Sequence, residues 1–163
     1  MKHGEASALR QLAAEVVERL AARGQTLAVA EAGTGGLIGY VITLIPGCSR
    51  VFPGGVISYS NDLKMAMGVP EATLQRYGAV SREAAEEMAL AARIFAESTL
   101  GLGLTSIAGP GGGSAAKPSG LTHIAITDGD RTLAEEHVFS EDRDGNMTRS
   151  AEAALNLVLR FLA

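Results

Sequence analysis

The stretch TLAVAEAGTGGLIGYVITLIPG, residues 26–47, contains the pattern from which the fold can be worked out. Residues 26–32 form a short apolar run, which predicts a buried strand. Residues 34–45 are entered through glycines and stop at Pro46-Gly47, which predicts a helix. A buried strand that leads through a glycine turn into a helix is typical of an α/β protein.

The same alternation continues along the rest of the chain. Helices are predicted from Leu9 to a stop at Gly24, after Ser60 or Asn61, from Ser81 onward, and at the end of the chain. Further strands are predicted at 54–60, 102–109, 121–127 and 131–140, the last two joined as a hairpin through Asp128-Gly129-Asp130. We therefore expect one domain, residues 1–163, folded as a three-layer α/β/α sandwich around a mixed, mainly parallel sheet.

Composition excludes several classes of function. The chain has 163 residues and a formal net charge of −4, and its Lys and Arg residues are scattered, so no basic stripe is present to bind a nucleic acid. Because no secretory signal and no run of about 18 apolar residues occurs, we expect a cytoplasmic protein that does not contact a membrane. The single cysteine, Cys48, and three scattered histidines lack the spacing of a metal site, so metal catalysis is not expected.

Two glycine-rich loops are the candidates for a binding site. EAGTGG, residues 31–36, follows the first predicted strand, and AGPGGGS, residues 108–114, follows a later one. Ligands of α/β sheets bind at the C-terminal ends of parallel strands, so both loops could face one cleft. Consecutive N–H groups in such loops, and at a helix N-terminus, favour a phosphate or an oxyanion. We expect the first loop to bind an anion; the alternative is that these glycines only make tight turns.

Four motifs together resemble one family. AEAGTGG (30–36), PGCSRVFPGGVISYSNDLK (46–64), GVPEATLQRYGAVS (68–81) and IAGPGGGSAAKPSG (107–120) are similar to the CinA C-terminal domain family. The resemblance extends from about Thr26 through the last helix. It implies hydrolysis of the carboxamide of nicotinamide mononucleotide to nicotinic acid mononucleotide and ammonia, without metal or cofactor, in a homo-oligomer.

The resemblance implies catalytic residues at three matching positions. Ser49 would be the nucleophile and Lys64 its base, while Tyr59 would relay a proton or orient the lysine. A lysine base must lose its proton near neutral pH, and both a helix N-terminus and desolvation lower a lysine pKa. The chain departs from the family in the first loop, where Ala32 and Gly33 replace a serine and the cysteine that usually follows it. If that serine were the nucleophile instead, Ala32 would make this chain a pseudoenzyme.

The substrate is expected to lie against the two loops. The residues expected to bind it are Ala32, Gly33, Thr34, Gly35 and Gly36 in the first loop, Gly109, Gly111, Gly112, Ser114 and Lys117 in the second, and Arg143. Arg143 could pair with the substrate phosphate, and N–H groups of the loops could bind the tetrahedral oxyanion. Two other functions stay open: a non-catalytic nucleotide-binding or regulatory module that lost activity through Ala32, and a purely structural domain.

Overall fold

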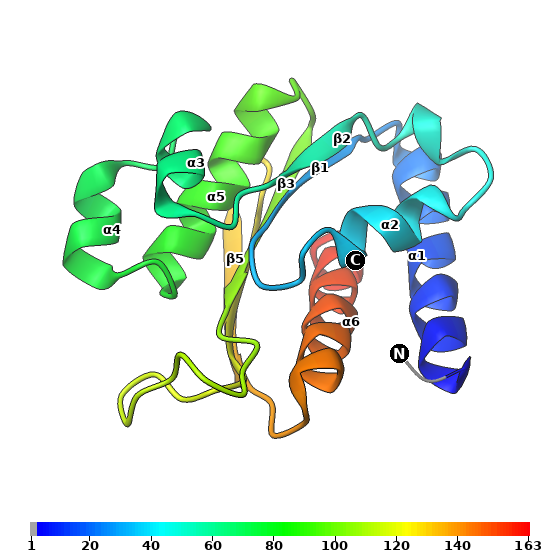
Figure 1. Ribbon diagram of the computed structural model, residues 1–163. Coiled ribbons are helices and arrows are strands. Elements are labelled where there is room, and N and C mark those ends of the chain that lie inside the picture. The colour runs from blue at the N-terminus through cyan, green and yellow to red at the C-terminus, as the bar shows by residue number, and fades with distance from the viewer. Residues whose placement is uncertain (1–2) are drawn as a thin grey trace.

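A computed structural model describes residues 3–163 as a five-stranded sheet between two layers of helices (Figure 1). The elements in chain order are α1 (His3–Arg23), β1 (Leu27–Glu31), α2 (Leu37–Thr43), the 3-10 helix η1 (Cys48–Arg50), β2 (Gly54–Ile57), α3 (Asn61–Ala66), α4 (Glu71–Tyr77), α5 (Arg82–Phe95), β3 (Leu100–Ser106), β4 (Leu121–Thr127), β5 (Thr132–Val138) and α6 (Arg143–Phe161). The predicted three-layer α/β/α architecture is confirmed.

The sheet is mixed, with the strand order β2-β1-β3-β4-β5. β1 is parallel to both β2 and β3, whereas β4 is antiparallel to both β3 and β5. All strands except β4 therefore point in the same direction, and the predicted hairpin joins β4 to β5. Glu31 at the end of β1 lies beside Leu104 of β3, so the two glycine-rich loops leave neighbouring strands at the same edge.

The two faces of the sheet are packed differently. α1, α2 and α6 cover one face and enclose large aliphatic side chains such as Leu27, Leu102 and Ile124. α5 covers the other face with alanines, and a Cβ added to Gly101 would lie only 1.9 Å from the carbonyl oxygen of Ala89. Glycine is required in β3 because the backbone of α5 approaches it so closely. None of the helices within residues 3–163 is long and apolar enough to cross a membrane.

The two edges of the sheet receive different connections. The loops after β1 and β3 lie at the C-terminal edge. The segment between α2 and β2, which contains η1, returns to the opposite edge, where the Leu27 N–H donates to the Val51 carbonyl at 2.8 Å. In Figure 1 this segment lies at the far side of the sheet from α3 and α4. The residues just before β2 therefore lie at the N-terminal edge, and those just after it lie at the C-terminal edge.

Candidate functional site

A cluster of side chains forms where the second loop, the start of α3 and the start of α6 meet. Arg143, the first residue of α6, donates through Nη1 to the Gly109 carbonyl at 2.7 Å and through Nη2 to the Tyr59 hydroxyl at 3.2 Å. One turn later Asn146 donates through Nδ2 to the Ala108 carbonyl at 3.0 Å. The structure thus brings Arg143 and Tyr59 together with the second loop at the C-terminal edge of the sheet.

Lys64 is buried beside this cluster, with only 1% of its surface exposed. Its Nζ donates to the Ser58 carbonyl at 2.7 Å and to the Tyr59 carbonyl at 3.3 Å. The Ser58 N–H donates to the Glu31 carbonyl at 2.8 Å, so this amine is held near the end of β1. Burial lowers the pKa of Lys64, because a desolvated ammonium is disfavoured relative to the neutral amine. A neutral amine in such a place can accept a proton.

Ala32 lies on the same face and at the same edge of the sheet as Lys64. Its side chain belongs to the apolar cluster between the sheet and α3 to α5, where Met65, the neighbour of Lys64, also packs. Continuing the pairing of β1 and β2 beyond Glu31 and Ile57 places Ala32 beside Ser58, whose carbonyl accepts from Lys64. Ala32, where the resemblance implies a serine, therefore lies next to the residue whose carbonyl accepts from Lys64.

Ser49 does not meet Lys64. It is exposed in η1, two residues before Val51, whose carbonyl pairs with the N–H at the start of β1. Lys64 is anchored at the other end of β1, and a strand of that length spans about 13 Å. The structure does not bring Ser49 and Lys64 of this chain together, because the chain returns to the N-terminal edge before β2 begins.

The first loop is built around an anion of its own. The Glu31 side chain, 1% exposed, accepts from the Thr34 hydroxyl at 2.7 Å and from the N–H groups of Gly36 at 3.1 Å, Ile38 at 3.1 Å and Gly39 at 2.8 Å. The start of a helix favours negative charge, and here the carboxylate supplies it. The Thr34 hydroxyl and the Gly36 N–H are therefore not free to bind a substrate anion, because the Glu31 carboxylate already accepts from both.

Two N–H groups of the first loop are left for a ligand. Gly35 donates to the Ala32 carbonyl at 3.0 Å, but within residues 3–163 the N–H groups of Gly33 and Thr34 have no acceptor. Both residues are buried. Unpaired buried N–H groups are rare, and two in succession can bind one oxygen of a ligand. A surface pocket of about 300 Å³ is lined by residues 34–37 on one side and by Met147 of α6 on the other.

Lys117 and Ser114 hold the second loop in place rather than pointing toward a phosphate. Lys117 donates through Nζ to the carbonyls of Tyr77 and Val80, each at 2.7 Å. Its own N–H donates to the Ser114 hydroxyl at 3.1 Å. The Lys117 ammonium thus donates to the connection between α4 and α5. This geometry does not support the expected contact of Lys117 with substrate.

Two glycines of the second loop, Gly111 and Gly112, are exposed, whereas Gly109 is buried. Gly109 and Gly112 adopt φ values of 84° and 82°, which disfavour any other residue. Gly111 is exposed, and a Cβ placed on it would meet nothing within 4 Å. The N–H groups of Gly111 and Gly112 have no acceptor in the described part of the chain, so both are available to an anionic ligand.

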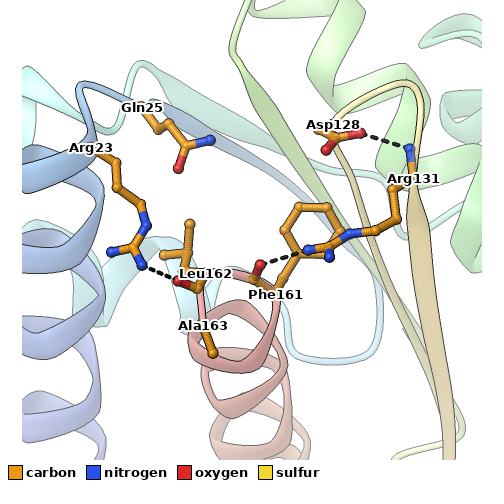
Figure 2. Close-up of a pocket in the computed structure, with 7 residues that line it drawn as sticks. All are labelled: Arg23, Gln25, Asp128, Arg131, Phe161, Leu162 and Ala163. Carbon is orange, nitrogen blue, oxygen red and sulfur yellow. Dashed lines mark hydrogen bonds between the residues drawn. The ribbon is translucent and has the colours of Figure 1, made fainter.

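A larger cavity, of about 500 Å³, lies at the opposite edge of the sheet (Figure 2). Arg23 and Arg131 line it and donate to the carbonyls of Leu162 and Phe161 at the end of α6. Arg131 also lies over the Phe161 ring, 4.0 Å from its centre. Since both guanidinium groups cap the C-terminus of α6, we assign this cavity to packing.

Comparisons with known proteins agree with the motifs and the geometry. The family model described as the CinA C-terminal domain matches residues 9–162. A CinA-like protein of Anaeromyxobacter sp. is 44% identical over 156 residues, which make up 95% of this chain and 38% of that protein. The chain spans little more than a third of the length of the curated relatives it matches, as the 36% for a CinA-like protein of Acidobacterium capsulatum also illustrates.

Solved structures share the fold. The competence/damage inducible protein CihA of Agrobacterium tumefaciens has a TM-score of 0.91 and 35% identity, with 94% of each chain covered. A CinA superfamily protein of Escherichia coli also has a TM-score of 0.91, over 99% of this chain and 93% of that one, and at 24% identity it is a likeness in fold alone. From the family match over residues 9–162 and these relatives, the chain belongs to the CinA C-terminal domain family.

Proposed function

We propose that this chain hydrolyses the carboxamide of nicotinamide mononucleotide to nicotinic acid mononucleotide and ammonia, the activity implied by the family resemblance. One observation carries the proposal: Lys64 is buried, has a lowered pKa and lies at the edge where Gly33 and Thr34 present unpaired N–H groups. Hydrolysis of an amide needs a base that is neutral near the working pH and donors for the oxyanion. In this proposal Lys64 meets the first requirement, and the N–H groups of Gly33 and Thr34 meet the second.

In this proposal Lys64 takes a proton from the attacking hydroxyl and returns it to the departing nitrogen. The carbonyls of Ser58 and Tyr59, which already accept from Nζ, hold the ammonium while it exists. The substrate phosphate contacts Arg143 and the open N–H groups of Gly111 and Gly112, where a charged donor and a concave backbone coincide.

Ammonia release from nicotinamide mononucleotide by the purified chain tests the proposal. The rate is expected to rise with pH and to level off below the ordinary lysine value of 10.5, because the pKa of Lys64 is lowered and only its neutral form acts as base. Lys64→Met is expected to lower kcat about a thousandfold. Asp62→Asn, on the exposed side of the same helix, is the control and leaves the rate unchanged.

A second function, nucleotide binding without turnover, is favoured by one observation, the alanine at position 32 beside Lys64. It predicts that calorimetry detects binding of nicotinamide mononucleotide while no ammonia is released at high protein concentration. In that case Ala32→Ser would give measurable turnover where the parent has none. Under the amidohydrolase proposal, Ala32→Ser raises a rate that is already measurable, since a further donor near the oxyanion is worth about a hundredfold.

A further inference from the structure

We propose that two copies of this chain pair through the outer edge of β2, so that the sheet continues from one copy into the other across a two-fold axis. β2 is the last strand on its side of the sheet, and among the strands of residues 3–163 its one neighbour is β1. The Ser58 N–H donates to the Glu31 carbonyl, so the backbone groups of every second residue before Ser58 also face β1. The N–H and C=O groups of Gly55 and Ile57 therefore face outward, where an edge strand can pair with another chain.

The two outer strands of the sheet differ in charge. β5, the outer strand on the other side, carries two adjacent glutamates, of which Glu135 is paired with Arg160 of α6. Charged side chains of this kind protect an edge strand from pairing with another chain. β2 has the sequence GGVI, and Arg50 is the one charged residue between Glu31 and Asp62. The β2 edge therefore lacks the charges that would keep it unpaired.

Exposed apolar side chains flank this edge. Ile57 of β2 and Tyr40 of α2 line one groove between the strand and the helix, and Leu44 follows Tyr40 one helical turn later. Ile57 is 51% exposed, Tyr40 is 56% exposed, and Tyr59, two residues beyond Ile57, is 62% exposed. At about 200 Å² for a side chain of this size, these four residues, the β2 patch, together expose about 400 Å².

A second copy of the chain fits this surface. Each partner in a standard interface buries about 800 Å², and the β2 patch supplies about half of that before the neighbouring backbone is counted. Because the patch is uncharged, facing its own copy brings no like charges together, although the whole chain has a net charge of −4. In antiparallel pairing about a two-fold axis, Gly55 of one copy lies opposite Ile57 of the other, and the outward backbone groups of both strands are paired.

A second group of exposed apolar residues, at the end of α5, does not combine these features. Ile94 is 63% exposed, but charged residues, Arg93 and Glu97, stand close to it in the sequence. It also lies on a helix, which offers another chain no strand to extend. Ile94 is therefore a matched control for Ile57, since both are exposed isoleucines and only Ile57 lies on the β2 edge.

Sedimentation velocity of the full chain at micromolar concentrations tests the proposal. The parent, 16.8 kDa as a single chain, is expected to sediment as a dimer of about 34 kDa. Ile57→Lys places a charge within the β2 patch and is expected to raise the dissociation constant of the dimer at least a hundredfold, whereas Ile94→Lys leaves it unchanged. A monomeric parent overturns the inference. A dimer that Ile94→Lys dissociates and Ile57→Lys does not also overturns it.

Amide hydrogen exchange of the parent keeps the test decisive if Ile57→Lys disturbs the fold. Exchange at Gly55 and Ile57 is expected to slow at least tenfold when the protein concentration rises from below to above the dissociation constant, because their N–H groups are paired in the dimer alone. Exchange in β5 should not change with concentration. A dimer in which exchange at Gly55 and Ile57 is independent of concentration overturns the inference. Neither measurement involves ammonia release, so the inference can fail while the proposed function stands.

Discussion

The two glycine-rich loops leave neighbouring parallel strands at the same edge, yet they use their N–H groups in opposite ways. In the first loop the carboxylate of Glu31 accepts from three N–H groups and one hydroxyl, and only two N–H groups remain unpaired. In the second loop Gly111 and Gly112 are exposed, and the loop's own Lys117 ties it to the carbonyls of Tyr77 and Val80. Glycine content shows that a loop can bind an anion; which anion it binds depends on neighbouring side chains.

The largest effect is expected from removing the internal anion of the first loop. Glu31→Ala leaves the buried N–H of Ile38 and the part-buried N–H groups of Gly36 and Gly39 without an acceptor, and an unpaired buried group costs about 1–3 kcal/mol. We expect the free energy of unfolding in urea to fall by about 4 kcal/mol. Glu18→Ala, at an exposed carboxylate of α1, serves as the control and changes it by less than about 0.5 kcal/mol.

In the parent the first loop has no room for an anion from solution, because Glu31 occupies the site. The Glu31→Ala variant frees that site. Inorganic phosphate is expected to raise the thermal midpoint of Glu31→Ala more than that of the parent, because the vacated helix N-terminus accepts it. If Glu31→Ala is as stable as the parent, the hydrogen bonds of the Glu31 carboxylate do not stabilise the first loop.

The next effect concerns the open loop. Gly111→Val adds bulk where a Cβ meets nothing, so the fold is retained, but a ligand over the exposed N–H groups is obstructed. Calorimetry is expected to show affinity for nicotinamide mononucleotide at least tenfold weaker, about 1.4 kcal/mol. Ala115→Val, in the same exposed loop, is the matched variant and should bind like the parent. Equal affinity for the Gly111 variant would mean that this loop does not contact the ligand.

A smaller effect is expected from releasing the second loop. Lys117→Met removes two hydrogen bonds to carbonyls of the α4–α5 connection, and we expect a loss of about 1 kcal/mol of stability. Amide hydrogen exchange over residues 109–117 should become about fivefold faster, since about 1 kcal/mol less opposes local opening. Exchange in β1 should not change. If amide exchange in the loop is unchanged, contacts other than those of Lys117 hold the loop in place.

No effect is expected from Ser49→Ala. The residue is exposed in η1 at the edge away from Lys64, so kcat for ammonia release should stay within twofold of the parent. Loss of turnover in this variant would return Ser49 to the reaction and contradict the separation of the two edges.

The sequence was sufficient to predict the layers, the hairpin and the shared edge of the two loops, because each depends on local periodicity and on the direction of parallel strands. The position of Ser49 could also have been inferred: a residue between a helix and the next parallel strand lies at the N-terminal edge. The motif resemblance hid this topological signal. The role of Glu31 had a weaker signal, an acidic residue just before a helix start, and it looked like a part of the loop that a ligand would face.

Contacts between distant segments were beyond the sequence. That Ser106 fills the space above Gly33, and that Lys117 reaches Tyr77 and Val80, depends on distances that no spacing in the chain encodes. The burial of Lys64 likewise follows from the packing of α3 against the sheet, since an isolated lysine on a short helix is ordinarily exposed.

The close approach of Gly33 and Ser106 has a consequence for the history of the chain. A side chain at position 33 would collide with the Ser106 hydroxyl in its present orientation, so the serine would have to turn or shift to make room for it. The two positions therefore cannot drift independently: a homologue that acquires a side chain at the first is expected to have lost the one at the second. An alignment of relatives in which larger residues occur at both positions would contradict this. If relatives instead carry a side chain at only one of the two positions, then the residues at positions 33 and 106 vary together.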